Sequence, residues 1–170
     1  MNKIILSLSS ILILFFAGQL HSEEKVIYGL AKVIDGDSIK IGKESIRLQG
    51  IDAPEIKQVC KKNDKPYMCG IIAKDALKNY LKLASDVSGE SLVYCYYSER
   101  DRYKRIVARC FLGKESLFYL NETMVRKGHA VAYTRYSKDY IEAQNKAKKM
   151  GIGIWQGEFD LPEDWRRKNK

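Results

Sequence analysis

The sequence predicts an α+β fold in which a small closed barrel of five strands carries helices packed on one side. Three features predict it. Short apolar and β-branched segments alternate with turn residues over residues 26–51 and again over 91–111. One long amphipathic helix pattern separates these groups of strands, and two shorter ones follow the second group. No repeat or long linker divides the 170 residues, a length that suits one domain with a proper core.

The first 22 residues have the composition of a secretory signal peptide. Lys3 precedes a mainly apolar run over residues 4–17, which is short for a membrane span and is followed by small and polar residues. We expect cleavage after Ser22 and a secreted or periplasmic protein, with an uncleaved anchor as the alternative. The expected divisions are a signal peptide at 1–22, a folded domain at 23–158 and a basic C-terminal tail at 159–170.

The chain is basic. Loss of the first 22 residues removes one lysine and no acid, which leaves 29 basic and 21 acidic residues and a net charge of +8. This excess suits a polyanionic partner such as nucleic acid or an anionic membrane surface.

The first strands are expected at residues 26–34, 38–41 and 45–51. Pro54 then ends the pairing, because proline has no amide hydrogen to donate.

The register of the second and third strands is open. A two-residue turn at Gly42 and Lys43 places Arg47 opposite Ser38. A three-residue loop that begins one residue earlier makes Arg47 face Asp37 instead, since a slip of one residue exchanges the faces. We prefer the three-residue loop on chemical grounds.

Residues 56–70 are lysine-rich and polar and are expected to form an exposed loop. The first helix follows, because apolar residues recur there at helical spacing. Its apolar face consists of Ala73, Ala76, Leu77, Tyr80, Leu81 and Ala84.

The second helix is expected between a cap at Ser116 and a stop at Gly128, with an apolar face of Leu117, Leu120 and Met124. The third starts after Ser137 and ends at Gly151, with a face of Tyr140, Ala143, Ala147 and Met150.

All four cysteines lie beyond the signal peptide, so disulfides are expected in an exported chain. A hairpin of residues 91–97 and 105–111 sets Cys95 opposite Cys110, and this leaves Cys60 to pair with Cys69. Zinc is the alternative, but the spacings contain no Cys-x-x-Cys pair.

His129 is the only histidine of the mature chain and follows a helix stop, where a surface or capping role is expected. Two-histidine ribonuclease chemistry, histidine-rich metal sites and serine or cysteine triads are therefore disfavoured. Catalysis must depend on carboxylates and arginines, with or without a metal.

Acidic residues are unusually dense among the aliphatic residues of the first strands, where carboxylates are normally depleted. Asp37 and Asp52 end strands on either side of one hairpin, and hard oxygen donors in a flexible shell suit Ca²⁺ better than zinc. Glu55, just past Pro54, could hold and deprotonate a water that attacks phosphorus. The alternative is that these acids bind lysines and cap turns.

Two arginines complete the pattern. Arg47 offers a planar fork that matches a phosphate, and Arg105 starts a strand beside Tyr103. Two guanidinium groups, one metal and one glutamate around a phosphodiester would neutralise the charge of the five-coordinate transition state. The alternative for the segment around Arg105 is a solvated turn.

With these residues together, the chain resembles the thermonuclease family, the staphylococcal nuclease-like proteins, from about Val26 to Trp155. The motifs that carry the resemblance are Asp-Gly-Asp at 35–37, Arg-Leu-x-Gly-Ile-Asp-Ala-Pro-Glu at 47–55, Asp-Arg-Tyr-x-Arg at 101–105 and Ala-Lys-Lys-x-Gly-x-Gly-Ile-Trp at 147–155. In two places the chain departs from the family. Lys104 stands where glycine is common, and Ser38 stands where threonine is.

The resemblance implies an OB-fold, a five-stranded Greek-key barrel with three helices, and Ca²⁺-dependent cleavage of DNA and RNA that leaves 3′-phosphate ends. By position, the calcium ligands would be Asp37, Asp52 and the main-chain carbonyl of Ala53, with Asp35 behind them. The catalytic group would be Arg47, Glu55 and Arg105. Tyr103 and Tyr133 resemble tyrosines that contact the nucleotide, although packing is an equal alternative for both.

The predicted protein is thus a calcium-dependent nuclease with little base preference, expected as a monomer without stable membrane association once the signal is cleaved. One alternative is an OB-fold module that binds nucleic acid without cutting it, and such a binder has no need of acids that repel phosphate. Another is a calcium-stabilised structural domain, which would not need both arginines.

Overall fold

The structure is a computed structural model that describes residues 24–88, 92–114 and 118–169. The predicted signal peptide at 1–22, the predicted cap at Ser116 and its neighbour Leu117 lie outside these ranges.

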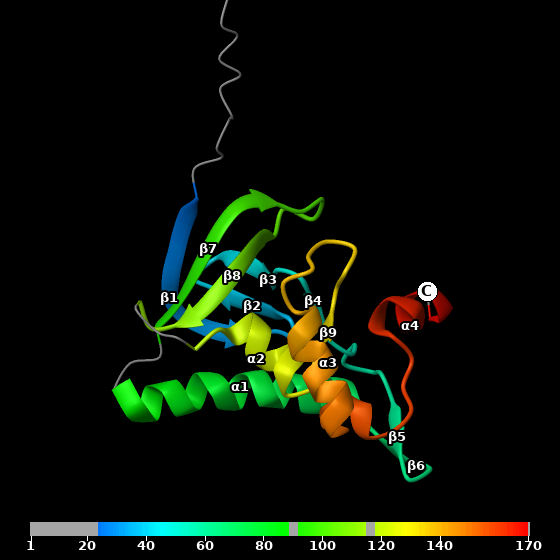
Figure 1. Ribbon diagram of the computed structural model, residues 1–170. Coiled ribbons are helices and arrows are strands. Elements are labelled where there is room, and N and C mark those ends of the chain that lie inside the picture. The colour runs from blue at the N-terminus through cyan, green and yellow to red at the C-terminus, as the bar shows by residue number, and fades with distance from the viewer. Residues whose placement is uncertain (1–23, 89–91, 115–117, 170) are drawn as a thin grey trace, which may run out of the picture.

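A closed barrel of five strands forms the centre of the fold (Figure 1). Its strands follow the order β1-β2-β3-β8-β7, and only the β3–β8 pair is parallel. Branched aliphatic side chains alternate into the interior, and Ile39, Ile46 and Ile106 are fully buried there. The five strands are β1 (Lys25–Val33), β2 (Ser38–Ile41), β3 (Glu44–Leu48), β7 (Leu92–Arg100) and β8 (Ile106–Leu112). The predicted barrel with helices, an OB-like α+β fold, is therefore confirmed.

The preferred register of β2 and β3 was wrong. Ile41 pairs with Glu44, so a two-residue turn at Gly42 and Lys43 joins the strands, and Arg47 lies opposite Ser38. Gly42 has a φ of 57°, which suits the tight turns that match strand twist.

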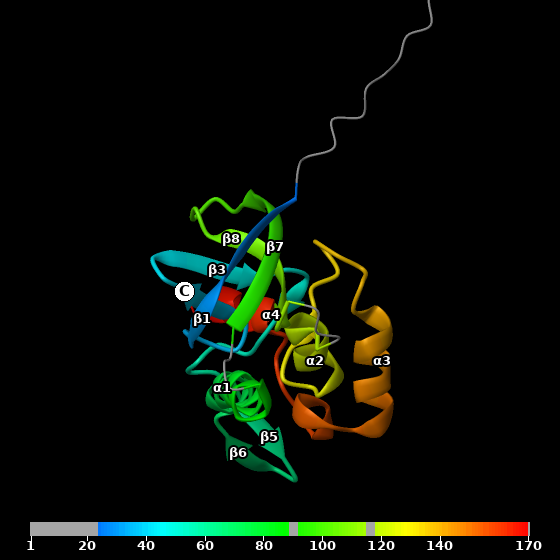
Figure 2. The same cartoon turned by 90° about the vertical axis from the view of Figure 1, so that its left-hand side faces the viewer.

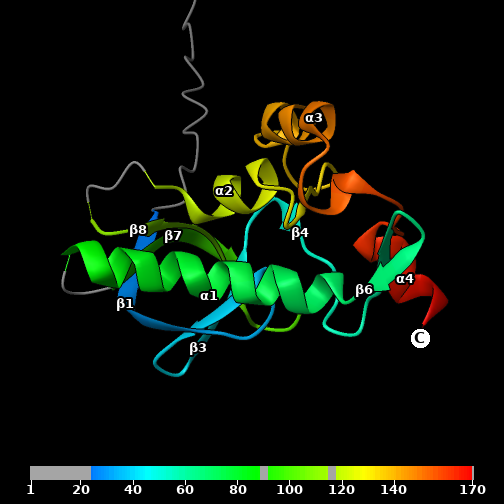
Figure 3. The same ribbon diagram turned by 90° about the horizontal axis from the view of Figure 1, so that it is seen from below.

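Helix α1 (Cys69–Ser88) precedes β7 in the chain and lies across one end of the barrel (Figures 1 and 3). Its residues Ala73, Leu77 and Leu81 pack into the core, as the helical spacing predicts. Helices α2 (Leu120–Arg126) and α3 (Ile141–Met150) lie together on one side of the barrel (Figure 2).

Helix α3 ends at Gly151, which adopts the left-handed conformation with a φ of 58°. Ala143 and Ala147 are buried as expected, but Met150 is 69% exposed because it lies in the last turn, past the contact with α2.

The segment expected to be an exposed loop contains a small hairpin, β5 (Cys60–Lys62) and β6 (Lys65–Tyr67). Asn63 and Asp64 turn it with positive φ values, which asparagine and aspartate tolerate better than other residues. The disulfide between Cys60 and Cys69 ties this hairpin to the start of α1.

The second disulfide joins Cys95 of β7 to Cys110 of β8, which are direct cross-strand partners in the barrel. Both predicted disulfides are thus present.

Beyond α3, the chain forms a 3-10 turn, η1 (Gly153–Gln156), and a short helix, α4 (Pro162–Lys168), within the predicted tail. Backbone hydrogen bonds between Lys61 and Glu158, of 2.8 and 3.0 Å, attach this end of the chain beside β5. The views in Figures 1 and 3 place α4 near that hairpin. No helix in the described ranges is both long and apolar enough to span a bilayer.

Candidate active site

The loop between β1 and β2 brings Asp37 to the rim of the barrel. The backbone N–H of Asp37 donates to Asp35 Oδ1 at 3.1 Å, a local turn that aspartate side chains favour. A side chain at Gly36 would place its Cβ 2.7 Å from Cβ of Ala53 and 2.8 Å from Cβ of Ala73. The Asp-Gly-Asp motif therefore needs glycine because this loop packs directly against the next segment of the site.

Asp37 is only 3% exposed and has a full set of partners. Its Oδ1 accepts hydrogen bonds from Ser38 Oγ, at 3.1 Å, and from Arg47 Nη1, and its Oδ2 accepts the Ala53 N–H at 2.7 Å. Burial raises the pKa of this carboxyl to about 7, although the charge of Arg47 and the Ala53 hydrogen bond act against the rise.

Arg47 bridges the two aspartates predicted to bind metal. One terminal nitrogen donates to Asp37, and the other donates to Asp52 Oδ1 at 2.8 Å and to the Ile51 carbonyl at 3.2 Å. Opposite Ser38 in the ladder, Arg47 still reaches Asp37 because its long side chain runs along the rim. The two aspartate charges outweigh burial and raise the pKa of the guanidinium, which stays charged.

Asp52 and Glu55 come from the segment after β3. Strand β4 (Ile51–Asp52) pairs with β9 (Val131–Ala132), and Gly50, with a φ of 73°, makes the turn that redirects the chain. The Asp52 carboxylate is 1% exposed, whereas that of Glu55 is 35% exposed and accessible to water.

Arg166 of α4, which the sequence reasoning missed, also binds these acids. Its Nη1 donates to Asp52 Oδ1 at 2.9 Å and to Glu55 Oε1 at 2.8 Å, and its Nη2 donates to Asp52 Oδ2 at 2.9 Å. Burial would lower the pKa of Arg166, but these hydrogen bonds and the two carboxylate charges raise it. The basic tail gave no sign of this contact, because a run of Arg and Lys is usually a solvated surface.

Arg105 lies in a different local network. Its Nε donates to Asp101 Oδ2 at 2.8 Å, and its guanidinium lies 5.5 Å from the centre of the Tyr103 ring. Within the described residues, it has no hydrogen bond or ion pair to Asp37, Asp52 or Glu55. The structure thus joins five predicted site residues to Arg47 through one hydrogen-bond network, in which Arg166 makes the link to Glu55. It places Arg105 with Asp101 and Tyr103. The five are Asp35, Asp37, Asp52, Ala53 and Glu55.

The two predicted nucleotide-contacting tyrosines differ in surroundings. Tyr103 is 65% exposed at the tip of the β7–β8 hairpin. The Tyr133 ring lies 4.8 Å from that of Tyr136, and burial, with the charges of Glu163 and Asp52, raises the pKa of its hydroxyl.

The donor atoms of the rim fit a hard divalent cation in their chemistry. The two terminal nitrogens of one guanidinium contact Asp37 and Asp52, so the two carboxylates, whose oxygens are donors that Ca²⁺ accepts, lie on the same side of the rim. Across the described ranges, no group of three or more His, Cys, Asp or Glu side chains is placed to hold a metal by itself. Main-chain and water oxygens would have to complete the shell, as the sequence predicted.

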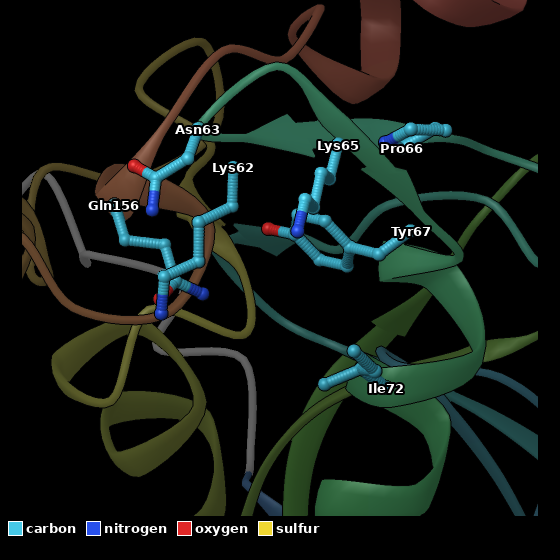
Figure 4. A pocket seen from close by; sticks show the side chains of 7 residues that line it. All are labelled: Lys62, Asn63, Lys65, Pro66, Tyr67, Ile72 and Gln156. Carbon is cyan, nitrogen blue, oxygen red and sulfur yellow. The ribbon is translucent and has the colours of Figure 1, made fainter.

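A separate cavity of about 400 Å³ lies beside the β5–β6 hairpin and contains none of the predicted site residues (Figure 4). Its lining comes from the hairpin, α1 and η1, and consists of Lys62, Asn63, Lys65, Pro66, Tyr67, Ile72 and Gln156.

Comparison with known proteins gives the family. The profile described as "Staphylococcal nuclease homologue" matches residues 45–157, two thirds of the chain, and this range includes Asp52, Glu55 and the β7–β8 hairpin but not Asp35 or Asp37. This chain belongs to the staphylococcal nuclease homologue family.

Individual relatives agree with the family match. An "Uncharacterized endonuclease" of Haemophilus influenzae is 33% identical over 171 aligned positions, covering 96% of this chain and 85% of the relative. The "Thermonuclease" of Staphylococcus hyicus is 30% identical and covers 83% of this chain and 82% of the relative. The "Succinoglycan biosynthesis protein ExoI" of Rhizobium meliloti is 38% identical, but the alignment covers 78% of this chain and 66% of that protein.

Proposed function

We propose that this protein is an exported, calcium-dependent nuclease that hydrolyses phosphodiester bonds of DNA and RNA with little base preference and leaves 3′-phosphate ends. The family match and the relatives named endonuclease and thermonuclease show that the chain is a nuclease. The observation that carries the finer proposal is the buried Asp37–Arg47–Asp52 bridge with Glu55 beside it.

In this proposal Asp37, Asp52 and the carbonyl of Ala53 hold Ca²⁺, and Asp35 fixes the backbone at Asp37. The ion supplies charge that neutralises the phosphate as it is attacked. Glu55, whose side chain is 35% exposed, holds the attacking water and takes its proton.

Arg47 and Arg105 would bind the phosphate oxygens. For Arg105 this role needs the guanidinium to exchange Asp101 for the phosphate. Tyr103, exposed on the same hairpin tip, is positioned to stack on a base, and Tyr133 is the second such candidate.

The setting of the enzyme is inferred from composition and from the disulfides. Residues 1–22 would serve as a cleaved signal peptide, and the two disulfides suit an oxidising compartment. We propose a secreted or periplasmic monomer whose net positive charge collects DNA and RNA, so that activity falls as salt rises.

The alternative function is that of a non-catalytic OB-fold module that binds nucleic acid. The acid cluster argues against it, because Asp37, Asp52 and Glu55 would repel a phosphate backbone that a pure binder must attract.

The test is digestion of plasmid, denatured DNA and RNA by pure protein in Ca²⁺, in Mg²⁺ and in chelator, followed by analysis of the product ends. We expect cleavage in Ca²⁺ and loss of it in chelator, with 3′-phosphate ends. Equal cleavage in all three conditions would refute the metal assignment. Binding without cleavage in any metal would favour the alternative module.

A further inference from the structure

Arg166 is the guanidinium closest to the predicted catalytic base. It is the one arginine of the described residues that contacts Glu55, at 2.8 Å, and it also holds both oxygens of Asp52. Its side chain is 33% exposed, so a ligand can approach it from solvent.

The segment that leads into α4 is attached by contacts other than those of Arg166. The Gln58 side chain donates to the Asp160 carbonyl at 2.7 Å, and Glu158 pairs with Lys61 through two backbone hydrogen bonds. Within this segment, Lys168 binds Asp160 at 2.7 Å. The helix is therefore attached next to the Glu55 loop by contacts that remain when Arg166 is replaced.

Arg47 and Arg105, the two arginines already proposed to bind phosphate, are likewise paired with acids in this structure. Both terminal nitrogens of Arg47 bind partners that build the rim, including Asp37 and Asp52. Arg105 is held by Asp101.

The Asp52 oxygens cannot keep all their hydrogen bonds with Arg166 and also bind a divalent cation. Its Oδ1 already accepts from Arg47 and Arg166, and its Oδ2 accepts from Arg166. A cation at Asp52 would compete for these oxygens and would repel the guanidinium. An Arg166 guanidinium released from Asp52 would still lie beside Glu55. The scissile phosphate must lie at the same place if a water held by Glu55 is to attack its phosphorus. Its planar fork suits two phosphate oxygens as well as two carboxylate oxygens.

We propose that Arg166 is a substrate-binding residue of the active site, which exchanges the Asp52 carboxylate for the scissile phosphate when cation and nucleic acid bind. This inference rests on the proposed nuclease function and adds to it a third phosphate-binding arginine, contributed by the C-terminal helix.

The experiment compares Arg166→Met and Arg166→Lys with Arg167→Met. Arg167 is the matched control, because it is the next residue of α4, its side chain is 71% exposed, and its ion pair in the described part of the chain is with Asp164. Three quantities are measured for each variant: steady-state cleavage of a single-stranded oligonucleotide in Ca²⁺, Ca²⁺ affinity by calorimetry, and affinity for the oligonucleotide in a Glu55→Gln background.

We expect Arg166→Met to lower kcat/KM and oligonucleotide affinity by at least about tenfold, the usual effect of losing a charge-assisted hydrogen bond. Arg166→Lys should keep part of both, since it retains the charge without the fork. Ca²⁺ affinity of Arg166→Met should equal or exceed that of the wild type, because the competing cation is gone. Arg167→Met should stay within about twofold of the wild type, as expected for an exposed charge.

Wild-type cleavage and oligonucleotide affinity in Arg166→Met would overturn the inference while leaving the proposed function in place. Faster cleavage would also overturn it, because Arg166 would then obstruct the site. Weaker Ca²⁺ binding in Arg166→Met would mean that the residue builds the acid cluster and does not bind phosphate. Absence of cleavage by the wild type in every metal would remove the proposed function and the inference together.

Discussion

The side-chain oxygen of Gln58 accepts a hydrogen bond of 3.2 Å from the backbone N–H of Glu55. The Gln58 N–H in turn donates to the Glu55 carbonyl at 2.7 Å, and its side-chain nitrogen donates to the carbonyl of Asp160. Gln58 is fully buried, so one amide joins the predicted catalytic base to the chain that leads into α4.

Replacing Gln58 with leucine should therefore disturb both stability and catalysis. The change removes the hydrogen-bond partner of the Glu55 N–H and of the Asp160 carbonyl, and each of these part-buried bonds contributes about 0.5–1.5 kcal/mol. We expect urea unfolding to show a loss of about 2 kcal/mol or more, and kcat to fall more than KM changes. Gln156→Leu, at an exposed position, is the control. Equal unfolding free energies for the two variants would refute the role of Gln58.

Lys104 adopts a left-handed conformation, with a φ of 64°, in the turn before Arg105. This conformation favours glycine, since only glycine takes it without steric cost. Lys104→Gly should raise the free energy of unfolding by about 0.5–1 kcal/mol, measured by thermal denaturation. Lys104→Ala keeps the strained backbone and should give no gain. Equal stabilisation by glycine and alanine would mean that the lysine side chain, not the backbone, is responsible.

The two disulfides close segments with sequence separations of 9 and 15 residues. Loss of either should cost about 3 kcal/mol on the chain-entropy model, measured by urea unfolding of Cys60→Ser/Cys69→Ser and Cys95→Ser/Cys110→Ser double variants. Only the first pair closes the β5–β6 hairpin, and its Cys60 lies two residues after Gln58. Cleavage should therefore fall more in the Cys60/Cys69 variant, compared at a temperature where both are folded. The opposite order would contradict the positioning role of the hairpin.

Burial, assisted by the charge of Lys127, lowers the pKa of His129 in the folded protein. In the unfolded chain this residue has the ordinary histidine pKa of about 6.5, so as the pH falls the unfolded chain binds the proton at a higher pH than the folded protein does. The stability that the neutral imidazole provides is therefore complete above the pKa of the unfolded chain. It is lost as the pH falls from that value toward the lower pKa of the folded protein. Thermal melts from pH 8 to 5 should show a loss in the wild type that His129→Gln lacks. Parallel curves would contradict a buried neutral imidazole.

The barrel and the helices could be predicted because their signals are local. Alternating apolar residues, the helical spacing after Ala73 and the glycine stop at 151 each act within a few residues. The cysteine pairing followed from the hairpin that sets Cys95 opposite Cys110. The sequence did not decide the register of β2 and β3. We preferred the register that sets Arg47 directly opposite Asp37, but the long Arg47 side chain makes that ion pair from its place opposite Ser38.

The position of Arg166 shows why part of the site stayed beyond prediction. Its contact with Asp52 joins residues 114 positions apart and depends on Glu158 pairing with β5, a strand within a segment predicted to be a loop. Arg105 is the converse case. Its motif was recognised, but a neighbouring aspartate, Asp101, satisfies its guanidinium locally.

The account depends most on Glu55 acting beside the Asp37–Arg47–Asp52 bridge, and the most direct measurement is the single-turnover cleavage rate of Glu55→Gln in saturating Ca²⁺. Removal of a general base should slow this rate by about 100-fold or more, while the affinity for a single-stranded oligonucleotide changes little. A cleavage rate equal to that of the wild type would contradict the central claim.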